Sequence, residues 1–311
     1  MSRLLRLIAL ACSLLASSAA LAEMNVGVSM ALFDDNYLTY LRESLLRKAK
    51  ADPQGMTLQF EDARGDVVKQ LNQVQMFVSQ KVDAIVVVPV DTAATRNITE
   101  AATRAGIPLV YLNRRPEQEN LPAGVVVVAS DEREAGRMQM RYLAERMNGK
   151  GHLAILLGDL ANTSTRDRTK GVKEVLAKYP GIQVVEEQSG VFLRDKGMDL
   201  MSNWLLSGRE IDALASNNDE MAIGAAMALQ QAGREKGSVL IGGTDGTPDG
   251  LAALKRGMLA MTVFQDAEGQ AGSALDAVSK LLRKQALEPT IWVPYQLVTR
   301  DNVESFQQRF K

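Results

Sequence analysis

Cysteine, histidine and aromatic side chains are scarce in this sequence. Among 311 residues there are one Cys and one His, and the aromatic residues make up 5%. One Cys and one His are too few for a Cys/His metal site, and they argue against a thiol enzyme. Because so few rings are available for stacking, the position of each ring is informative.

An excess of charge of either sign is also missing. The 36 Lys and Arg residues are balanced by 37 Asp and Glu residues, which gives a net charge of −1. The chain therefore lacks the basic surplus that is typical of nucleic-acid binding, and it has no acidic tail. We expect no nucleic-acid partner, and the balance favours a small neutral ligand or a protein surface.

The N-terminal residues 1–22 have the pattern of a secretory signal peptide. Arg3 and Arg6 precede an apolar run from Leu7 to Ala20, and Ala20-Leu21-Ala22 has the small residues of a cleavage site. The run is too short to serve as a membrane anchor. We therefore expect cleavage after Ala22 and export to the periplasm. Lipid attachment at Cys12 is not expected, because cleavage there would leave an apolar N-terminus.

The rest of the chain alternates between short apolar runs rich in β-branched residues and stretches of helical periodicity. The run AIVVVPV at 84–90 is typical of a strand that is buried on both faces, as in parallel sheets. At Val125–Ala129 one strand follows another, and a helix then restarts the alternation at Asp131. Near the C-terminus we expect a strand at Trp292–Leu297 and a helix at Val303–Phe310. The pattern predicts an α/β protein with two doubly wound parallel-sheet lobes.

Polar side chains follow nearly every predicted strand. Open parallel α/β sheets bind ligands beyond the carboxyl ends of their strands, so these are candidate binding residues. Guanidinium, carboxylate and amide groups can each hold two neighbouring hydroxyls, and the rings of Phe33, Tyr37, Phe192 and Phe264 could cover the C–H face of a sugar ring. The polar candidates are Asp34, Asp35, Asn36, Asn113, Arg114, Arg115, residues 163–168, Asn217, Asn218, Asp245 and Gln265.

Each candidate also has a simpler interpretation. Asp or Asn directly after a strand is commonly a helix N-cap, and Asn218 or Asp245 taken alone fits a cap better than a ligand group. Arg114 or Arg115 taken alone fits a solvated charge. The recurrence of such residues at nearly all strand ends, in both halves of the chain, favours the binding interpretation.

Enzyme signatures are thin. The sequence has no Gly-x-Ser-x-Gly elbow, no Walker phosphate loop and no Gly-x-Gly-x-x-Gly turn after a strand. His152 begins a predicted strand, where a structural role is expected. Asp34 and Asp35 are adjacent and diverge in direction, and nothing else completes a glycosidase site. We therefore expect no catalytic residue, no metal and no cofactor.

Several strand-end motifs resemble the ribose-type periplasmic binding proteins of bacterial ABC importers, and the resemblance extends over essentially the whole mature chain. The most specific motifs are NNDEMAIGA at 217–225, GGTDGTPDG at 242–250 and VVVPVDTAA at 86–94. Within that family, the inositol and rhizopine branch is similar in SMALFDDNYLTYLR at 29–42, PLVYLNRRP at 108–116 and MTVFQDAEGQ at 261–270.

The resemblance implies a set of ligand residues. The first-lobe Arg of the family corresponds to Arg114, with Asn113 beside it, and the second-lobe Arg corresponds to Arg168, with Arg166 as an alternative. The remaining positions that match are Phe192, Asn218, Asp245 and Gln265. Ribose binders have two adjacent Phe at the start of the first helix, whereas this chain has Phe33, Asp34, Asp35, Asn36 and Tyr37.

This departure favours a ligand with more hydroxyls than ribose, and myo-inositol or a derivative is the expected ligand. Another monosaccharide such as ribose is the alternative, and an exported sugar hydrolase is a more remote one. A repressor of the same fold would need an N-terminal helix-turn-helix, where this chain has the signal peptide. The resemblance also implies a membrane permease as partner, and it leaves a chemoreceptor open.

The resemblance implies that the two lobes close on the ligand about a hinge. We expect an N-terminal lobe of residues 23–129 plus 266–289, and a C-terminal lobe of residues 130–265 plus 290–311. The chain would then cross between the lobes near Ala129–Asp131, Gln265–Asp266 and Glu288–Ile291.

Overall fold

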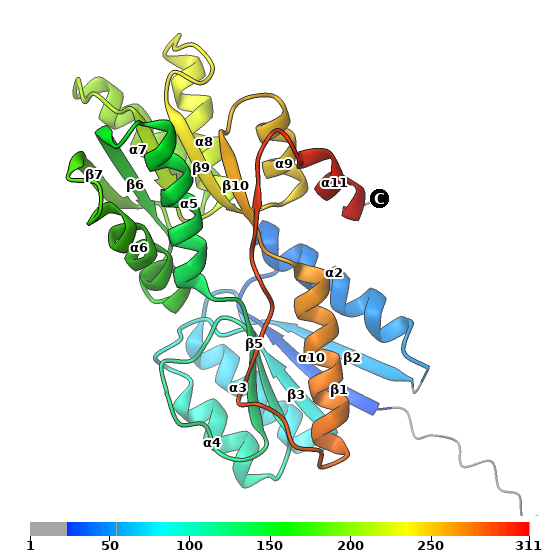
Figure 1. Cartoon of the computed structure of the whole chain (residues 1–311). Helices are drawn as coiled ribbons and strands as arrows, with labels where there is room; N and C mark the ends of the chain where they lie inside the picture. Colours follow the sequence, from blue (N-terminus) through cyan, green and yellow to red (C-terminus); the bar gives the residue numbers. More distant parts are fainter. Residues whose placement is uncertain (1–23, 54, 311) are drawn as a thin grey trace, which may run out of the picture.

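The computed structural model describes residues 24–53 and 55–310, which form two α/β lobes (Figure 1). The predicted signal peptide and its cleavage site after Ala22 lie outside the described residues. Each lobe is built on a sheet of six strands, in the two-lobed doubly wound arrangement that the alternation predicts. Within the described residues, no helix combines the length and the apolar character needed to cross a membrane.

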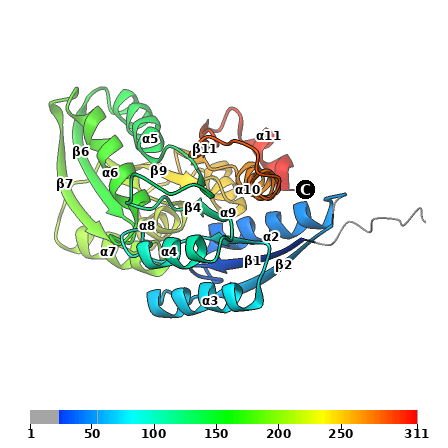
Figure 2. The ribbon, with the colours of Figure 1, turned by 90° about the horizontal axis from the view of Figure 1, so that it is seen from below.

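The first sheet is parallel throughout, in the order β11-β5-β4-β3-β1-β2. Helices α2 and α10 cover one face and α3 and α4 cover the other, which explains why its central strands are apolar on both sides. Figure 2 shows β1 and β2 between α2 and α3. The elements of this lobe are β1 (Met24–Met30), α2 (Asn36–Lys50), β2 (Met56–Asp62), α3 (Val67–Gln80), β3 (Ala84–Val87), α4 (Arg96–Arg104), β4 (Leu109–Asn113), β5 (Val125–Ala129), α10 (Ala267–Leu282) and β11 (Thr290–Trp292).

The second sheet has the order β12-β10-β9-β8-β6-β7, and all its pairs are parallel except that of β12 with β10. Helices α5 and α6 pack on one face, and α7, α8, α9 and α11 pack on the other. The elements are α5 (Glu132–Arg146), β6 (Lys150–Leu157), α6 (Thr163–Leu176), β7 (Gly181–Ser189), α7 (Arg194–Leu206), β8 (Ala213–Ser216), α8 (Asp219–Gln231), β9 (Leu240–Asp245), α9 (Pro248–Lys255), β10 (Met261–Phe264), β12 (Gln296–Val298), α11 (Val303–Gln307) and the 3₁₀ turn η2 (Gln308–Phe310).

Three connectors join the lobes (Figure 1). The first runs from β5 through Ser130 to α5, and the second runs from β10 to α10. In the second, Gln265 still hydrogen-bonds to Asp245 of β9 through its N–H, while Asp266 caps α10. The third runs from β11 to β12 and is centred on Pro294.

The C-terminal strand differs from the sequence-based expectation. The strand expected at Trp292–Leu297 is two strands, β11 in the first sheet and β12 in the second. Pro294 has no N–H to donate and interrupts the ladder between them. Val293 still donates its N–H to Ala129 of β5, so the third crossing lies after Val293 and not at Glu288–Ile291. Residues 290–292 accordingly belong to the first sheet.

Candidate functional site

The carboxyl ends of both sheets face each other across a narrow cavity between the lobes. Residues predicted from strand ends in both halves of the chain line it, so the fold brings together side chains that are far apart in the sequence. The lining residues from the first lobe are Asp35, Tyr37, Leu38, Asn113 and Arg114, and those from the second lobe and its connector are Asn162, Ser164, Arg168, Phe192, Asn218, Asp245 and Gln265.

A second, larger cavity of about 270 Å³ adjoins the first, and both are lined by Asp35, Tyr37, Arg114, Phe192 and Asn218. Since these residues border both, the two form one continuous space between the lobes. Asp34 and Asn36 line only this larger part of the space, together with Glu220 and Arg194.

Phe33 lines neither cavity, although the sequence places it among the candidate site residues. Its ring lies under the Arg42 guanidinium, 4.3 Å from the centroid, and packs against the core of the first lobe. The turn before α2 directs this ring away from the space between the lobes.

On the first-lobe side, Arg114 and Asp35 form a loose ion pair. Asp35 caps α2 by accepting a hydrogen bond from the N–H of Leu38 at 2.9 Å through one oxygen, and its other oxygen lies 3.9 Å from Arg114. Arg114 also donates to the carbonyl of Pro89 at 3.1 Å. Burial lowers the pKa of Arg114, and the Asp35 carboxylate partly opposes this. The pair therefore presents both a donor and an acceptor to the cavity.

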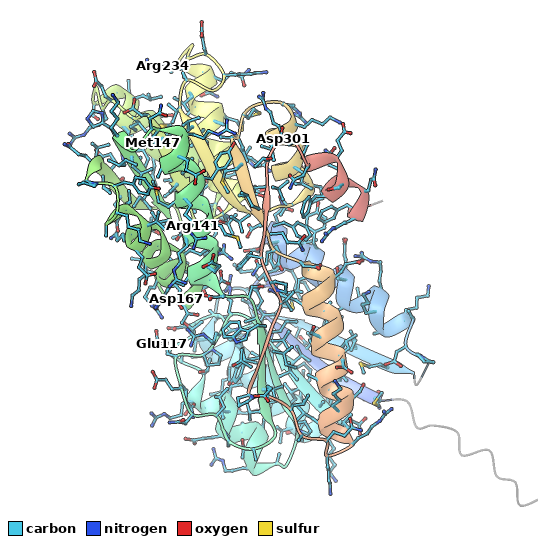
Figure 3. The ribbon with its side chains drawn as sticks, viewed as in Figure 1. Glu117, Arg141, Met147, Asp167, Arg234 and Asp301 are labelled. Atoms are coloured by element: carbon cyan, nitrogen blue, oxygen red, sulfur yellow. The ribbon has the colours of Figure 1, made fainter. Side chains whose placement is uncertain are left out.

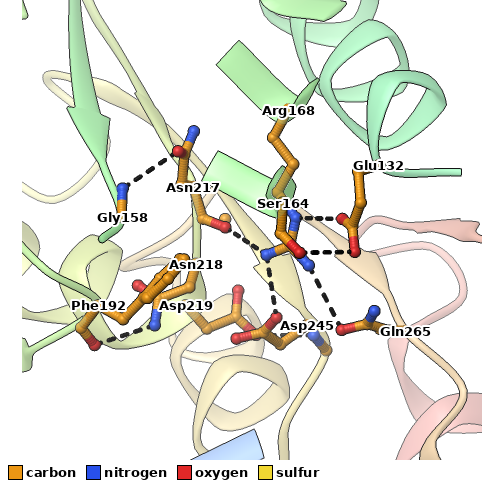
Figure 4. Close-up of polar contacts among 12 residues, drawn as sticks. Glu132, Gly158, Ser164, Arg168, Phe192, Asn217, Asn218, Asp219, Asp245 and Gln265 are labelled. Atoms are coloured by element: carbon orange, nitrogen blue, oxygen red, sulfur yellow. Dashed lines mark hydrogen bonds and ion pairs between the residues drawn. The ribbon is translucent and has the colours of Figure 1, made fainter. Parts of the chain in front are cut away.

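On the second-lobe side, the guanidinium of Arg168 donates hydrogen bonds to five neighbouring groups, and Figure 4 shows four of these neighbours. Its Nε donates to Glu132 at 2.6 Å, and the remaining donors reach the Asn217 carbonyl at 2.6 Å and the Tyr295 hydroxyl at 2.9 Å. Longer contacts of 3.4 Å reach Asp245 and Gln265. Burial would lower the pKa of Arg168, but Glu132, Tyr295 and Asp245 outweigh this and hold the pKa well above its usual value.

Asp245 ends β9 with its carboxylate buried in the cavity. Burial raises its pKa well above the usual value, an effect that Arg168 partly offsets. It does not cap the following helix, because the side chain of Thr247 caps α9. The simpler interpretation of Asp245 as a cap is therefore wrong. Asn218 does cap α8, by accepting from the N–H of Met221 at 3.0 Å, and it lines the cavity as well.

Asp219 supports the turn that carries Asp245. One of its oxygens accepts from the N–H groups of Gly246 and Thr247 at 2.8 and 3.2 Å, and the other accepts from the Thr262 hydroxyl at 2.6 Å. Burial raises the pKa of Asp219 to about 7. Gly246 has a φ of +64°, and a Cβ there would lie 2.7 Å from the Phe264 ring, so the turn requires glycine.

Three of the predicted site residues adopt positive φ values. Asn113, Phe192 and Asp245 have φ angles of 67°, 67° and 123°. Such conformations are costly for residues other than glycine and tend to occur at functional sites. Three residues that line the cavity are thus held in strained backbone conformations.

Two polar atoms at the cavity have no hydrogen-bond partner among the described residues. These are the hydroxyl of Tyr37 and Nε2 of Gln265, both buried. Burial, and then the charge of Asp245, raise the pKa of Tyr37 well above its usual value, so its hydroxyl keeps its proton and can donate. A buried donor without a partner is unfavourable, so both groups are available to a polar ligand.

Phe192 is held at the cavity by its neighbours. Its carbonyl accepts from Nδ2 of Asn218 at 3.0 Å. Gly158 leaves room for the ring, because a Cβ at that position would lie 2.1 Å from it. The ring therefore reaches the cavity, as the sequence predicts for a stacking aromatic.

The structure distinguishes between the two candidate arginines of α6. Arg168 lines the cavity, whereas Arg166 points to the rim, where it pairs with Glu117 of the first lobe. Sequence reasoning missed Glu132 and Tyr295, the buried partners of Arg168. Glu132 follows Asp131 and is expected only as a first-turn acid, and Tyr295 falls in a stretch expected to be strand, so neither carried a specific signal.

Direct contacts between the lobes border the cavity on both sides. On one side, Asn36 donates to Glu220 at 2.6 Å. On the other, the Thr163 hydroxyl donates to the carbonyl of Arg115 at 2.8 Å, and Arg115 pairs with Asp167 at 3.0 Å. Figure 3 shows Asp167 of the second lobe at the junction with Glu117 of the first. The lobes are thus in contact around the cavity, in a closed arrangement.

The chemistry of the cavity suits hydroxyl groups. Its lining combines charged and neutral donors with carboxylate acceptors, and an –OH group both donates and accepts. Among the described residues, no group of three or more His, Cys, Asp and Glu side chains is placed to hold a metal ion.

Comparison with known proteins identifies the family. The profile of the periplasmic binding protein domain matches residues 26–286. The chain belongs to this family. A Rhizobium meliloti protein described as rhizopine-binding is 47% identical over 304 residues, which cover 97% of this chain and 98% of the relative. The ribose import binding protein of Bacillus subtilis is 31% identical, over 89% of this chain and 88% of the relative.

Solved structures of this periplasmic binding protein family have the same two-lobed fold. An ABC transporter solute-binding protein from Bacillus halodurans with bound myo-inositol has a TM-score of 0.87 and 37% identity, over 92% of this chain and 98% of its own. A Caulobacter myo-inositol binding protein has a TM-score of 0.85 and 26% identity, over 91% and 95%. The relatives are solute-binding proteins and not enzymes. The present chain is accordingly a periplasmic binding protein of the ABC-importer type, and it is not an enzyme.

Proposed function

We propose that this protein captures myo-inositol or a close derivative between its lobes and delivers it to a membrane permease. The observation that carries the proposal is that two ion pairs, one from each lobe, line the same cavity. Asp35 and Arg114 come from the first lobe, and Arg168 and Asp245 come from the second. A ring with a hydroxyl on every carbon can hydrogen-bond to both pairs at once.

The proposed ligand residues are those that border the cavity. The unpaired hydroxyl of Tyr37 and the unpaired amide of Gln265 supply donors for ligand oxygens. Phe192 offers an apolar ring for the C–H face of the ligand. The full proposed set is Asp35, Tyr37, Asn113, Arg114, Arg168, Phe192, Asn218, Asp245 and Gln265, with Asp34 and Asn36 at the border of the larger cavity.

The choice of a cyclitol rests on the start of α2 and on the relatives. Ribose binders have two adjacent Phe at the start of the first helix, whereas α2 begins with Asn36 and Tyr37 here, and the Tyr37 hydroxyl is a donor without a partner. The relatives named above include a rhizopine-binding and two myo-inositol-binding proteins. Both considerations favour a ligand with more hydroxyls than ribose.

Ligand binding would shift the population of the protein towards the closed form, because contacts from both lobes are available only in that form. We propose that the signal peptide is cleaved after Ala22, that the mature chain resides in the periplasm, and that the permease binds the closed form. A chemoreceptor that recognises the same closed form is a second proposed partner.

Calorimetric titration with myo-inositol, scyllo-inositol, ribose, galactose and xylitol tests the proposed ligand. We expect an inositol to have the lowest Kd, and a lower Kd for ribose would contradict the proposal. A thermal-shift screen gives an independent measurement, since a ligand at about 100 times its Kd adds about 2.7 kcal/mol of stability. A turnover assay on the tightest ligand should show no product.

A further inference from the structure

The contacts of Arg168 fall into two groups by length. The contacts to Glu132, the Asn217 carbonyl and the Tyr295 hydroxyl are 2.6, 2.6 and 2.9 Å long. Those to Asp245 and Gln265, the two cavity residues, are both 3.4 Å. A guanidinium has five N–H donors, so the five contacts account for all of them. A ligand oxygen would compete with the two long contacts and leave the three short ones in place.

Glu132 and Tyr295 also bond to each other. The Tyr295 hydroxyl accepts from Arg168 and donates to Oε2 of Glu132 at 2.6 Å, and the same oxygen accepts from Nε of Arg168. The other Glu132 oxygen accepts from the hydroxyl of Ser164 at 3.1 Å. The side chains of Arg168, Glu132 and Tyr295 thus form a closed, buried set of charge-assisted hydrogen bonds. The orientation of the guanidinium is therefore determined before any ligand arrives.

The partners of Arg168 lie at the second-lobe ends of all three connectors. Glu132 is the first residue of α5, directly after the first connector. Gln265 precedes Asp266, where the chain turns into α10 of the first lobe. Tyr295 follows Pro294 of the third connector and packs against Ala135 and Val263 of the second lobe. One side chain in the ligand cavity thus ties together the places where the chain leaves the second lobe.

We propose that Glu132 and Tyr295 are positioning residues of the ligand site. They hold the Arg168 guanidinium so that its two amino groups face the cavity, and they join this ligand contact to the connectors about which the lobes turn. The inference rests on the proposed function in one respect, namely that Arg168 contacts the ligand.

The Tyr295→Phe variant tests the role of the hydroxyl. We expect the Kd for myo-inositol, or for the tightest polyol of the panel above, to rise by about 3- to 10-fold, as for a lost hydrogen bond. The matched control is Tyr142→Phe, because the Tyr142 hydroxyl donates to the carbonyl of Ala260 at 3.2 Å and has no contact with Arg168. Equal Kd values for Tyr295→Phe and Tyr142→Phe would overturn the proposal.

A double-mutant cycle with Arg168→Lys separates positioning from a general structural role. A lysine cannot bond to Glu132, Tyr295 and the cavity at once, so Tyr295→Phe should change its Kd by less than about 2-fold in that background. An undiminished effect of Tyr295→Phe would overturn the positioning role. Wild-type affinity of Arg168→Lys would instead remove Arg168 from the proposed ligand site. Glu132→Gln should weaken binding in the same Arg168-dependent way, and Tyr295→Phe keeps the test valid if Glu132→Gln does not fold.

Discussion

Thr247, two residues after Asp245, caps helix α9 by accepting a hydrogen bond from the N–H of Gly250 at 3.1 Å. Capping and the proposed ligand contact therefore belong to different side chains of one turn. Asp245 is left with its carboxylate in the cavity, 3.4 Å from Arg168. The two roles can be separated by mutation.

Asp245→Ser should weaken ligand binding by about 10- to 100-fold, because a single hydroxyl cannot hold two ligand hydroxyls as a carboxylate does. The unfolding midpoint should not fall, since the buried carboxylate is unfavourable in the free protein. Thr247→Ala is the control: it should cost about 1 kcal/mol of stability and leave the affinity nearly unchanged. Titration calorimetry and thermal unfolding measure both effects. Wild-type affinity of Asp245→Ser would show that the carboxylate does not contact the ligand.

Tyr37→Phe should raise the Kd by about 3- to 10-fold without destabilising the free protein, because the hydroxyl has no partner before ligand binds. Tyr111→Phe provides the opposite case. The Tyr111 hydroxyl contacts the Thr99 hydroxyl at 2.8 Å and the Thr95 carbonyl at 3.1 Å, so its removal should cost about 1 kcal/mol or more of stability and spare the affinity. A marked loss of stability in Tyr37→Phe would argue against the free hydroxyl.

Arg115→Ala should raise the Kd by at most about 5-fold, since it removes one partly exposed ion pair between the lobes. The effect should shrink at high salt because such pairs are screened. Arg141→Ala is the matched control: the side chains are 42% and 49% exposed, but Arg141 pairs with Glu134 inside the second lobe. Equal effects of the two variants at low salt would contradict a role for Arg115 in closure.

Asp219 predicts a pH dependence of stability. Burial raises its folded-state pKa to about 7, above the unfolded value of 3.8, so the folded protein binds more protons between these values. The free energy of unfolding should therefore fall as pH rises from about 4 to about 7, by up to about 1.4 kcal/mol per pH unit from this group. Asp219→Asn should remove that slope. Urea titrations across this range would refute the assignment if both proteins had the same pH profile.

The sequence predicts those parts of the site that depend on local pattern. Arg114 directly follows β4 and Asp245 is the last residue of β9, and the carboxyl ends of parallel strands share one edge, so the strand pattern predicts both. Glu132 and Tyr295 could not be found in this way, because they meet Arg168 only through the tertiary arrangement of the connectors. Phe33 was misplaced since the direction of a ring in a turn depends on backbone angles that spacing does not specify. The short strands β11 and β12 were merged because periodicity does not show a change of sheet.

Because α10 and β11 return to the first lobe, they determine when that lobe can finish folding during synthesis. The α10 residues Ala271, Ala274, Leu275 and Val278 fill one face of the first core, and β11 covers the edge of β5. A nascent chain that has reached Ala129 possesses the first five strands of that lobe and helices α2, α3 and α4, but it lacks α10, which shares one face of the sheet with α2. The lobe that is begun first is therefore completed only after the second lobe has been made almost to its end. The long-range contacts of the first lobe make slow folding the expectation for this chain. Until α10 is made, the part of the sheet face that it covers is the apolar surface that a chaperone would meet.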